Sequence, residues 1–125
     1  MSGNSLILDT NTVLYFLGGD QTISDFIKDK NLYISFITEL ELLSFDKISP
    51  SEVKIISDFL TETNIVNISQ EIKDIVISLR RANKLKLPDS IIAATAIALK
   101  IPLFTADKRI KSLKDLNVIY YEFNV

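Results

Sequence analysis

Short apolar runs alternate with amphipathic stretches along almost the whole of this 125-residue chain. The runs have the length and composition of buried strands, and the stretches repeat apolar residues with the period of helices that cover a core. Such alternation is typical of a parallel sheet with helices on both faces. We therefore predict an α/β fold in one domain over residues 1–125, a three-layer α/β/α sandwich around a central parallel sheet of four to five strands.

Capping residues and helix breakers mark where several of these elements begin and end. Gly18 and Gly19 end the first helix. Ser49 supplies a capping hydroxyl directly before Pro50, which suits the first turn of a helix, and Ser69 caps a longer helix. The predicted strands are 5–8, 32–35, 65–68, 103–104 and 118–121, and the predicted helices are 10–17, 22–28, 37–45, 49–60, 69–83, 88–99 and 108–113.

Four acidic residues lie just beyond or inside the apolar runs. Asp9 follows the first strand, Asp107 follows the fourth, Asp89 opens a helix, and Glu41 lies within an apolar helix face. Each aspartate alone is explained by helix capping, but a buried carboxylate such as Glu41 costs several kcal/mol unless a partner compensates it. Ligands of parallel sheets gather at the carboxyl ends of the strands, where Asp9 and Asp107 fall. One shared cation site accounts for all four residues.

The chain contains no His and no Cys, which excludes nitrogen and sulfur ligands from side chains and the usual general base. Oxygen ligands select hard cations, so the predicted cofactor is Mg²⁺ or Mn²⁺. Such ions polarise a phosphodiester and activate water. The small polar side chains Thr10, Asn11 and Thr105 lie close by in sequence and are expected to orient ligands from outside the metal's own shell.

Charge is distributed unevenly along the chain. Residues 1–72 carry four Lys+Arg against eleven Asp+Glu, whereas residues 73–114 carry ten against three. A basic segment of this kind is typical either of a nucleic-acid-facing surface or of solvated helix faces. No apolar run approaches the ~20 residues of a membrane span, and no leader-like segment begins the chain, so we expect a cytoplasmic protein without a membrane partner.

Four stretches together resemble the PIN-domain nucleases, and most closely the small VapC-type ribonuclease toxins of toxin–antitoxin systems. They are residues 7–11 (ILDTN), 37–42 (ITELEL), 87–96 (LPDSIIAATA) and 102–107 (PLFTAD). The resemblance implies Mg²⁺- or Mn²⁺-dependent endonucleolytic cleavage of RNA, with Asp9, Glu41, Asp89 and Asp107 as metal-binding catalytic residues. It further implies support from Asn11 and Thr105, a homodimer, and a cognate antitoxin that inserts a peptide into the active-site groove.

The chain departs from the family pattern at two places. Family members often have an acidic residue two positions after the last motif aspartate, where this chain has Arg109, and many have a glycine where it has Ser44 and Phe45. The basic residues next to the motifs are predicted to bind RNA phosphates. They are Arg80, Arg81, Lys84, Lys86, Lys108 and Arg109.

Other functions fit the sequence less well or differ in detail. An aspartyl-phosphate phosphatase requires a second aspartate where Asn11 stands, and a receiver domain requires acids and a lysine at strand ends that lack them here. Two alternatives share the predicted fold and remain open. One is a housekeeping RNA-processing nuclease, and the other is a catalytically idle module that binds RNA or protein.

Overall fold

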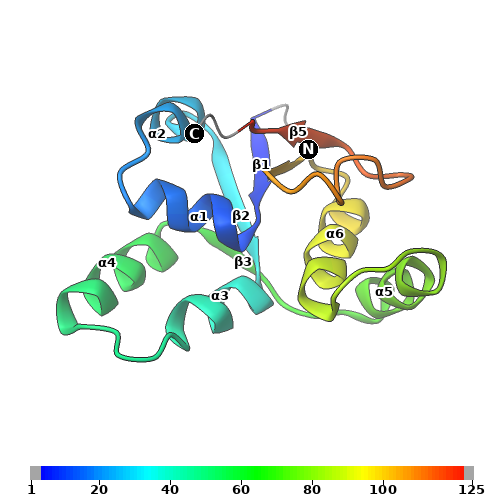
Figure 1. The fold of residues 1–125 in the computed structure, drawn as a ribbon, viewed down its shortest axis with the longest axis horizontal. Helices are drawn as coiled ribbons and strands as arrows, with labels where there is room; N and C mark the ends of the chain where they lie inside the picture. Colours follow the sequence, from blue (N-terminus) through cyan, green and yellow to red (C-terminus); the bar gives the residue numbers. More distant parts are fainter. Residues whose placement is uncertain (1–3, 123–125) are drawn as a thin grey trace.

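Five parallel strands form the centre of the molecule in a computed structural model that describes residues 4–122. The strands are β1 (Ser5–Leu8), β2 (Asn31–Ser35), β3 (Asn64–Val66), β4 (Leu103–Thr105) and β5 (Val118–Tyr120). The helices are α1 (Thr10–Leu17), α2 (Gln21–Ile27), α3 (Phe36–Leu43), α4 (Pro50–Thr61), α5 (Gln70–Ala82) and α6 (Leu87–Leu99). The strand order β3-β2-β1-β4-β5 places the first strand in the middle of the sheet (Figure 1).

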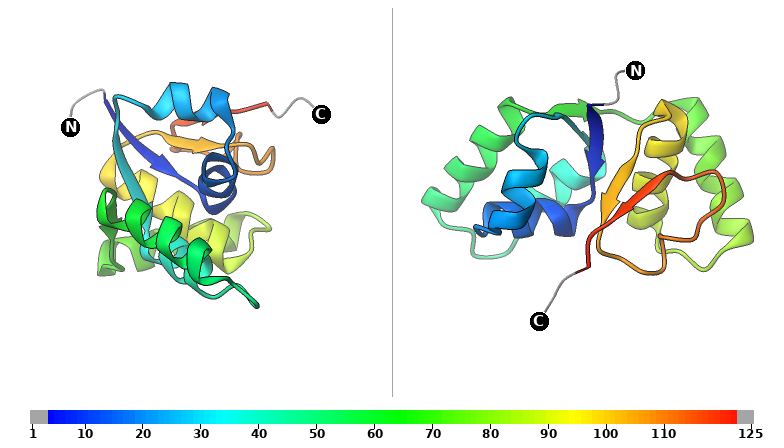
Figure 2. Two further views of the ribbon diagram at one scale, coloured as in Figure 1. Left: turned by 90° about the vertical axis from the view of Figure 1, so that its left-hand side faces the viewer. Right: turned by 90° about the horizontal axis from the view of Figure 1, so that it is seen from above.

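Helices cover both faces of this sheet and complete the predicted three-layer α/β/α sandwich (Figures 1 and 2). On β1, Leu6 and Leu8 contribute to the core beneath α1, α2 and α4. Ile7, between them, faces the opposite core, which α5 and α6 close. This alternation follows from the two-residue period of a strand that is buried on both sides. Helix α3 begins directly where β2 ends and packs against α4 and α6.

The predicted capping residues set the helix starts. Ser49 forms a capping box with Glu52 at the start of α4, and the Ser69 hydroxyl accepts from the backbone of α5. Helix α6 has Pro88 in its first turn and no side-chain cap, while Asp89 supplies an acid to that turn. Helices α5 and α6 have 13 residues each, and within residues 4–122 no helix is both long and apolar enough to cross a bilayer.

The prediction of a helix over residues 108–113 is wrong, because this segment forms consecutive turns. Backbone bonds from Ile110 N to Asp107 O (3.2 Å) and from Leu113 N to Ile110 O (3.1 Å) close tight four-residue turns. The Asp107 carboxylate accepts from Arg109 N (2.9 Å), the side-chain-to-backbone bond of an Asx turn at the start of the segment. Ile110 and Leu113 are both buried, so the apolar spacing that resembled a helix reflects anchoring of the loop to the core.

Candidate functional site

The four predicted acids come from four different elements and line one pocket of about 200 Å³. Asp9 follows β1 and caps α1, Asp107 lies just after β4, Glu41 belongs to α3, and Asp89 belongs to the first turn of α6. Since β1 and β4 are parallel neighbours, their carboxyl ends place Asp9 and Asp107 at the same edge. The remaining lining residues are Thr10, Asn11, Leu14, Phe45 and Ile92.

Asp9 is the most buried of these acids, with 6% of its surface exposed. Its Oδ1 accepts from Thr12 N and from the Thr12 hydroxyl, both at 2.9 Å, and its Oδ2 accepts from the Thr105 hydroxyl. Burial raises the pKa of Asp9, while the bonds from Thr105 and Thr12 lower it and the nearby Asp107 charge raises it again. The net pKa lies above the ordinary value, so the charged form of Asp9 lacks full compensation within the chain.

Glu41 is held by a chain of hydroxyl groups. The Thr10 hydroxyl donates to Glu41 Oε1 at 2.6 Å, and Thr10 Oγ1 lies 3.0 Å from the Thr38 hydroxyl. A hydroxyl has one proton, so Thr38 donates to Thr10 while Thr10 donates to Glu41. Thr38 is fully buried, and this network fixes the direction of the Glu41 carboxylate towards the pocket.

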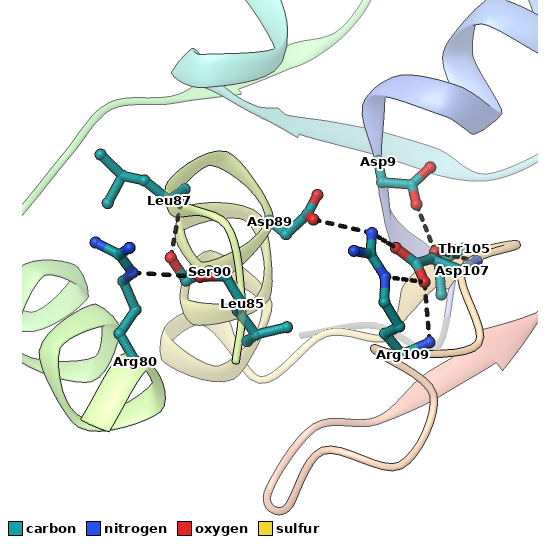
Figure 3. A network of polar contacts seen from close by, with 9 residues as sticks. All are labelled: Asp9, Arg80, Leu85, Leu87, Asp89, Ser90, Thr105, Asp107 and Arg109. Atoms are coloured by element: carbon teal, nitrogen blue, oxygen red, sulfur yellow. Dashed lines mark hydrogen bonds and ion pairs between the residues drawn. The ribbon is translucent and has the colours of Figure 1, made fainter. Parts of the chain in front are cut away.

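Arg109 binds the other two acids (Figure 3). Its Nε and Nη2 donate to the two oxygens of Asp107, at 3.1 and 2.7 Å, and Nη2 also lies 3.3 Å from Asp89 Oδ2. Hydrogen bonds from Arg109 lower the pKa of Asp107 below its ordinary value. Burial raises the pKa of Asp89, an effect that Arg109 opposes and that the charges of Asp107, Asp9 and Glu41 reinforce.

The acids share a pocket without yet forming a closed ligand shell. Within residues 4–122, no group of three or more acidic side chains lies close enough to hold one ion together. Carboxylate and hydroxyl oxygens nevertheless make a donor set that suits Mg²⁺ or Mn²⁺. Coordination by several of these carboxylates therefore requires side-chain rearrangement within the pocket.

The predicted RNA-binding residues fall into two groups. Lys108 and Arg109 follow Asp107 directly, and Lys86 precedes α6, whose first turn holds Asp89; all three are exposed. Arg80 lies across the start of α6 from Asp89, and its Nε donates to the Leu85 carbonyl at 3.4 Å (Figure 3). The other members of this second group, Arg81 and Lys84, are also exposed.

Two buried hydroxyls at the site were missed by the sequence analysis. Thr12 bonds to Asp9, and Thr38 bonds to Thr10. A signal for Thr12 existed, because a hydroxyl three residues after a capping aspartate lies where that carboxylate accepts its helical bond. Thr38 offered none, since its partner is 28 residues away. The predicted supporting residue Asn11 lines the pocket but is exposed, whereas Thr105 is fully buried on Asp9.

The chain is similar to one known protein family and to several solved structures. The profile of the PIN domain matches residues 6–116, whereas no curated protein matches the chain by sequence. A toxin–antitoxin complex from Klebsiella pneumoniae contains a similar chain with 30% identity and a TM-score of 0.81, over 94% of this chain and 99% of that one. VapBC2 from Rickettsia felis, bound to a promoter DNA fragment, gives 22% identity and a TM-score of 0.84 over the same shares. VapBC-1 from Haemophilus influenzae gives 21% and 0.81 over 93% of this chain and 97% of that one. The chain belongs to the PIN domain family, as the resemblance of its four motifs predicted.

Proposed function

We propose that this chain is a Mg²⁺- or Mn²⁺-dependent endoribonuclease, a single PIN-like nuclease domain over residues 1–125. We further propose that it is the toxin component of a type II toxin–antitoxin system. The observation that carries the nuclease proposal is the convergence of Asp9, Glu41, Asp89 and Asp107 on one pocket at the carboxyl edge of the sheet. The toxin role is supported by the similar chains in toxin–antitoxin complexes.

The residues of the pocket fit a divalent cation held by Asp9, Glu41, Asp89 and Asp107. When bound, such an ion would polarise a phosphodiester and acidify water. The threonine hydroxyls on Asp9 and Glu41 orient these two carboxylates and are themselves neutral, so they leave the negative charge in place. Burial of Asp9 concentrates that charge in a region of low dielectric, which favours a cation there over an empty pocket.

Three partners complete the proposal. RNA is expected to contact Arg80, Arg81, Lys84, Lys86, Lys108 and Arg109 through its phosphates. A cognate antitoxin is expected to bind the chain and suppress cleavage, and a second copy of the chain is expected to form a homodimer. The proposed site of action is the cytoplasm, where the RNA substrate is found.

The test is cleavage of a single-stranded RNA of mixed sequence with Mg²⁺ or Mn²⁺. We expect products with 5′-phosphate and 3′-hydroxyl ends, because hydrolysis by activated water leaves the 2′-hydroxyl unused. EDTA and the Asp9→Asn variant are the controls, and both should abolish cleavage. A 2′,3′-cyclic phosphate product, or cleavage that survives both controls, would contradict the mechanism.

Two further results separate the alternatives. Growth arrest on expression, absent with Asp9→Asn and relieved by a small gene directly upstream, would support the toxin over a housekeeping nuclease. RNA binding by the folded protein with no cleavage under either metal would favour the catalytically idle module.

A further inference from the structure

Arg109 is the one basic side chain that, within residues 4–122, forms ion pairs with acids of the pocket. Its Nε and Nη2 donate to the two carboxylate oxygens of Asp107, and we call this bidentate contact the Arg109 fork. The backbone N–H of Arg109 also donates to Asp107, and the same Nη2 reaches Asp89. The planar guanidinium is suited to such bidentate contact, whereas a lysine ammonium would act as a point charge.

The carboxylates of the pocket differ in how many hydrogen bonds their oxygens accept. Asp107 Oδ1 accepts two bonds from Arg109 and its Oδ2 accepts a third, so three of the roughly four lone-pair positions of this carboxylate are taken. By contrast, within the described part of the chain no hydrogen bond reaches Glu41 Oε2 or Asp89 Oδ1, and Asp9 Oδ2 accepts from Thr105 alone. Oxygens able to receive a cation therefore lie on the side of Asp9, Glu41 and Asp89.

The charges of the pocket also favour one cation over two. Four ionised carboxylates attract divalent cations strongly, but Arg109 cancels one unit of this charge from within the pocket. A cation beside Asp9 can use the one lone-pair position of Asp107 that Arg109 leaves open, whereas a second cation on Asp107 must displace a guanidinium that already holds both oxygens.

We infer that Arg109 is a resident positive charge of the carboxylate site, which limits the site to one divalent cation and weakens the binding of that cation. This inference rests on the proposed function, because it concerns the same metal site. Arg109 is the residue at which this chain departs from the family pattern, and its positive charge takes the place of a second metal ion.

The experiment counts Mn²⁺ bound per chain, by titration calorimetry and by the electron paramagnetic resonance of free Mn²⁺, without RNA. The wild-type chain is expected to bind one ion. Arg109→Gln is expected to bind its first ion on the order of 10-fold more tightly, since a half-exposed charge acts through a dielectric between those of water and interior. The same variant is expected to take up a second ion.

Two variants control for charge and shape. Lys73→Gln removes one positive charge from the exposed face of α5 and is expected to bind like the wild type. Arg109→Lys keeps the charge but loses the fork, and it is expected to remain a one-ion site. Circular dichroism of each variant verifies that it is folded.

The outcomes are distinct. Equal affinity and one ion in both the wild type and Arg109→Gln would overturn the inference and leave the proposed nuclease intact. A matching gain in Lys73→Gln, or two ions in Arg109→Lys, would also overturn it. Absence of Mn²⁺ binding in every variant, or binding that survives Asp9→Asn, would refute the metal site itself and the inference with it.

Discussion

The two halves of the acidic pocket stabilise their carboxylates by different means. Asp9 and Glu41 accept hydrogen bonds from threonine hydroxyls and keep their full negative charge. Asp89 and Asp107 are bridged by Arg109, which neutralises part of theirs. Neutral donors orient a carboxylate, whereas a guanidinium both orients it and cancels its charge. We therefore expect a cation from solution to matter most for the hydroxyl-bound half.

The pKa shifts of Asp9 and Asp107 differ in direction, in line with this difference, whereas burial raises the pKa of Asp89 despite its contact with Arg109. Burial raises the pKa of Asp9, and the hydrogen bonds it receives do not offset that effect. Bonding to Arg109 lowers the pKa of Asp107. A carboxylate that the protein itself leaves under-compensated in a pocket is typical of a functional site, and a fully paired one is typical of a structural ion pair.

The largest effect is expected from Asp9→Asn, which removes the central charge of the hydroxyl-bound half. RNA cleavage should fall by at least about 100-fold, more than the loss typical of a residue that merely supports a ligand. Without divalent cation, the same change should raise the free energy of unfolding at neutral pH, because it removes an under-compensated buried charge. Cleavage assays and urea titrations in EDTA measure the two. A less stable variant would show that Asp9 is a structural residue.

Thr12→Val tests whether the hydroxyl donors matter. Valine has nearly the shape of threonine but lacks the hydroxyl that donates to Asp9 Oδ1, while the backbone N–H of residue 12 still donates to that oxygen, and Thr12 is fully buried. We expect a loss of about 2 kcal/mol in unfolding free energy, the range for a hydrogen bond to a charged group. Mn²⁺ affinity should fall roughly 10-fold, as for other residues that orient a metal ligand. Thr12→Ser restores the donor, and failure to recover both properties would argue that packing of the methyl group is what matters.

Most secondary-structure elements and the four acids that line the pocket could be predicted from the sequence, because both depend on local or periodic features. Strand β1 and helix α1 were predicted with their observed bounds, and Asp9 and Asp107 follow from the rule that places functional residues at the carboxyl ends of parallel strands. Thr105 was found because it belongs to the same motif as Asp107.

Sequence reasoning failed where the outcome depends on a side-chain contact. Residues 108–113 have the apolar spacing of a helix, but the chain forms turns in which the side chains of Ile110 and Leu113 pack into the core. The contacts of the Arg109 guanidinium with two acids were not predicted, because they depend on how the loop folds, and the predicted contact of Arg109 with RNA stays a prediction. Thr38 reaches Thr10 across 28 residues, a distance that no local pattern encodes.

The pH dependence of stability should distinguish Asp9 from Asp107 in EDTA. Folded Asp9 holds its proton more tightly than the unfolded chain does, so its ionisation lowers stability as pH rises from about the ordinary value of 3.8 to its raised pKa. For Asp107 the sign is opposite, because its contribution is complete above 3.8 and is lost as pH falls through its lowered pKa.

Urea titrations at a series of pH values check this prediction. Relative to the wild type, Asp9→Asn should become more stable as pH rises from about 3.8 to the raised pKa of Asp9. Above that pKa the difference in stability should stay constant. Asp107→Asn should have a lower free energy of unfolding than the wild type above pH 3.8. This difference should disappear as pH falls through the lowered pKa of Asp107. Parallel curves for both variants would mean that Asp9 and Asp107 do not differ in how the protein compensates their charge.

The smallest effect is expected from added salt, which should act on one half alone. The Arg109 side chain is 57% exposed, so its pairs with Asp89 and Asp107 lie within reach of counter-ions. Between about 0.1 M and about 1 M NaCl the Debye length falls from about 10 Å to about 3 Å. In EDTA, the small stability difference between the wild type and Arg109→Gln should shrink over this range. The difference caused by Thr12→Val should persist, because that hydrogen bond is buried and its donor carries no charge. A salt-independent Arg109→Gln difference would mean that the guanidinium acts through its fixed hydrogen-bond geometry more than through its charge, and an Arg109→Lys variant would then be as unstable as Arg109→Gln.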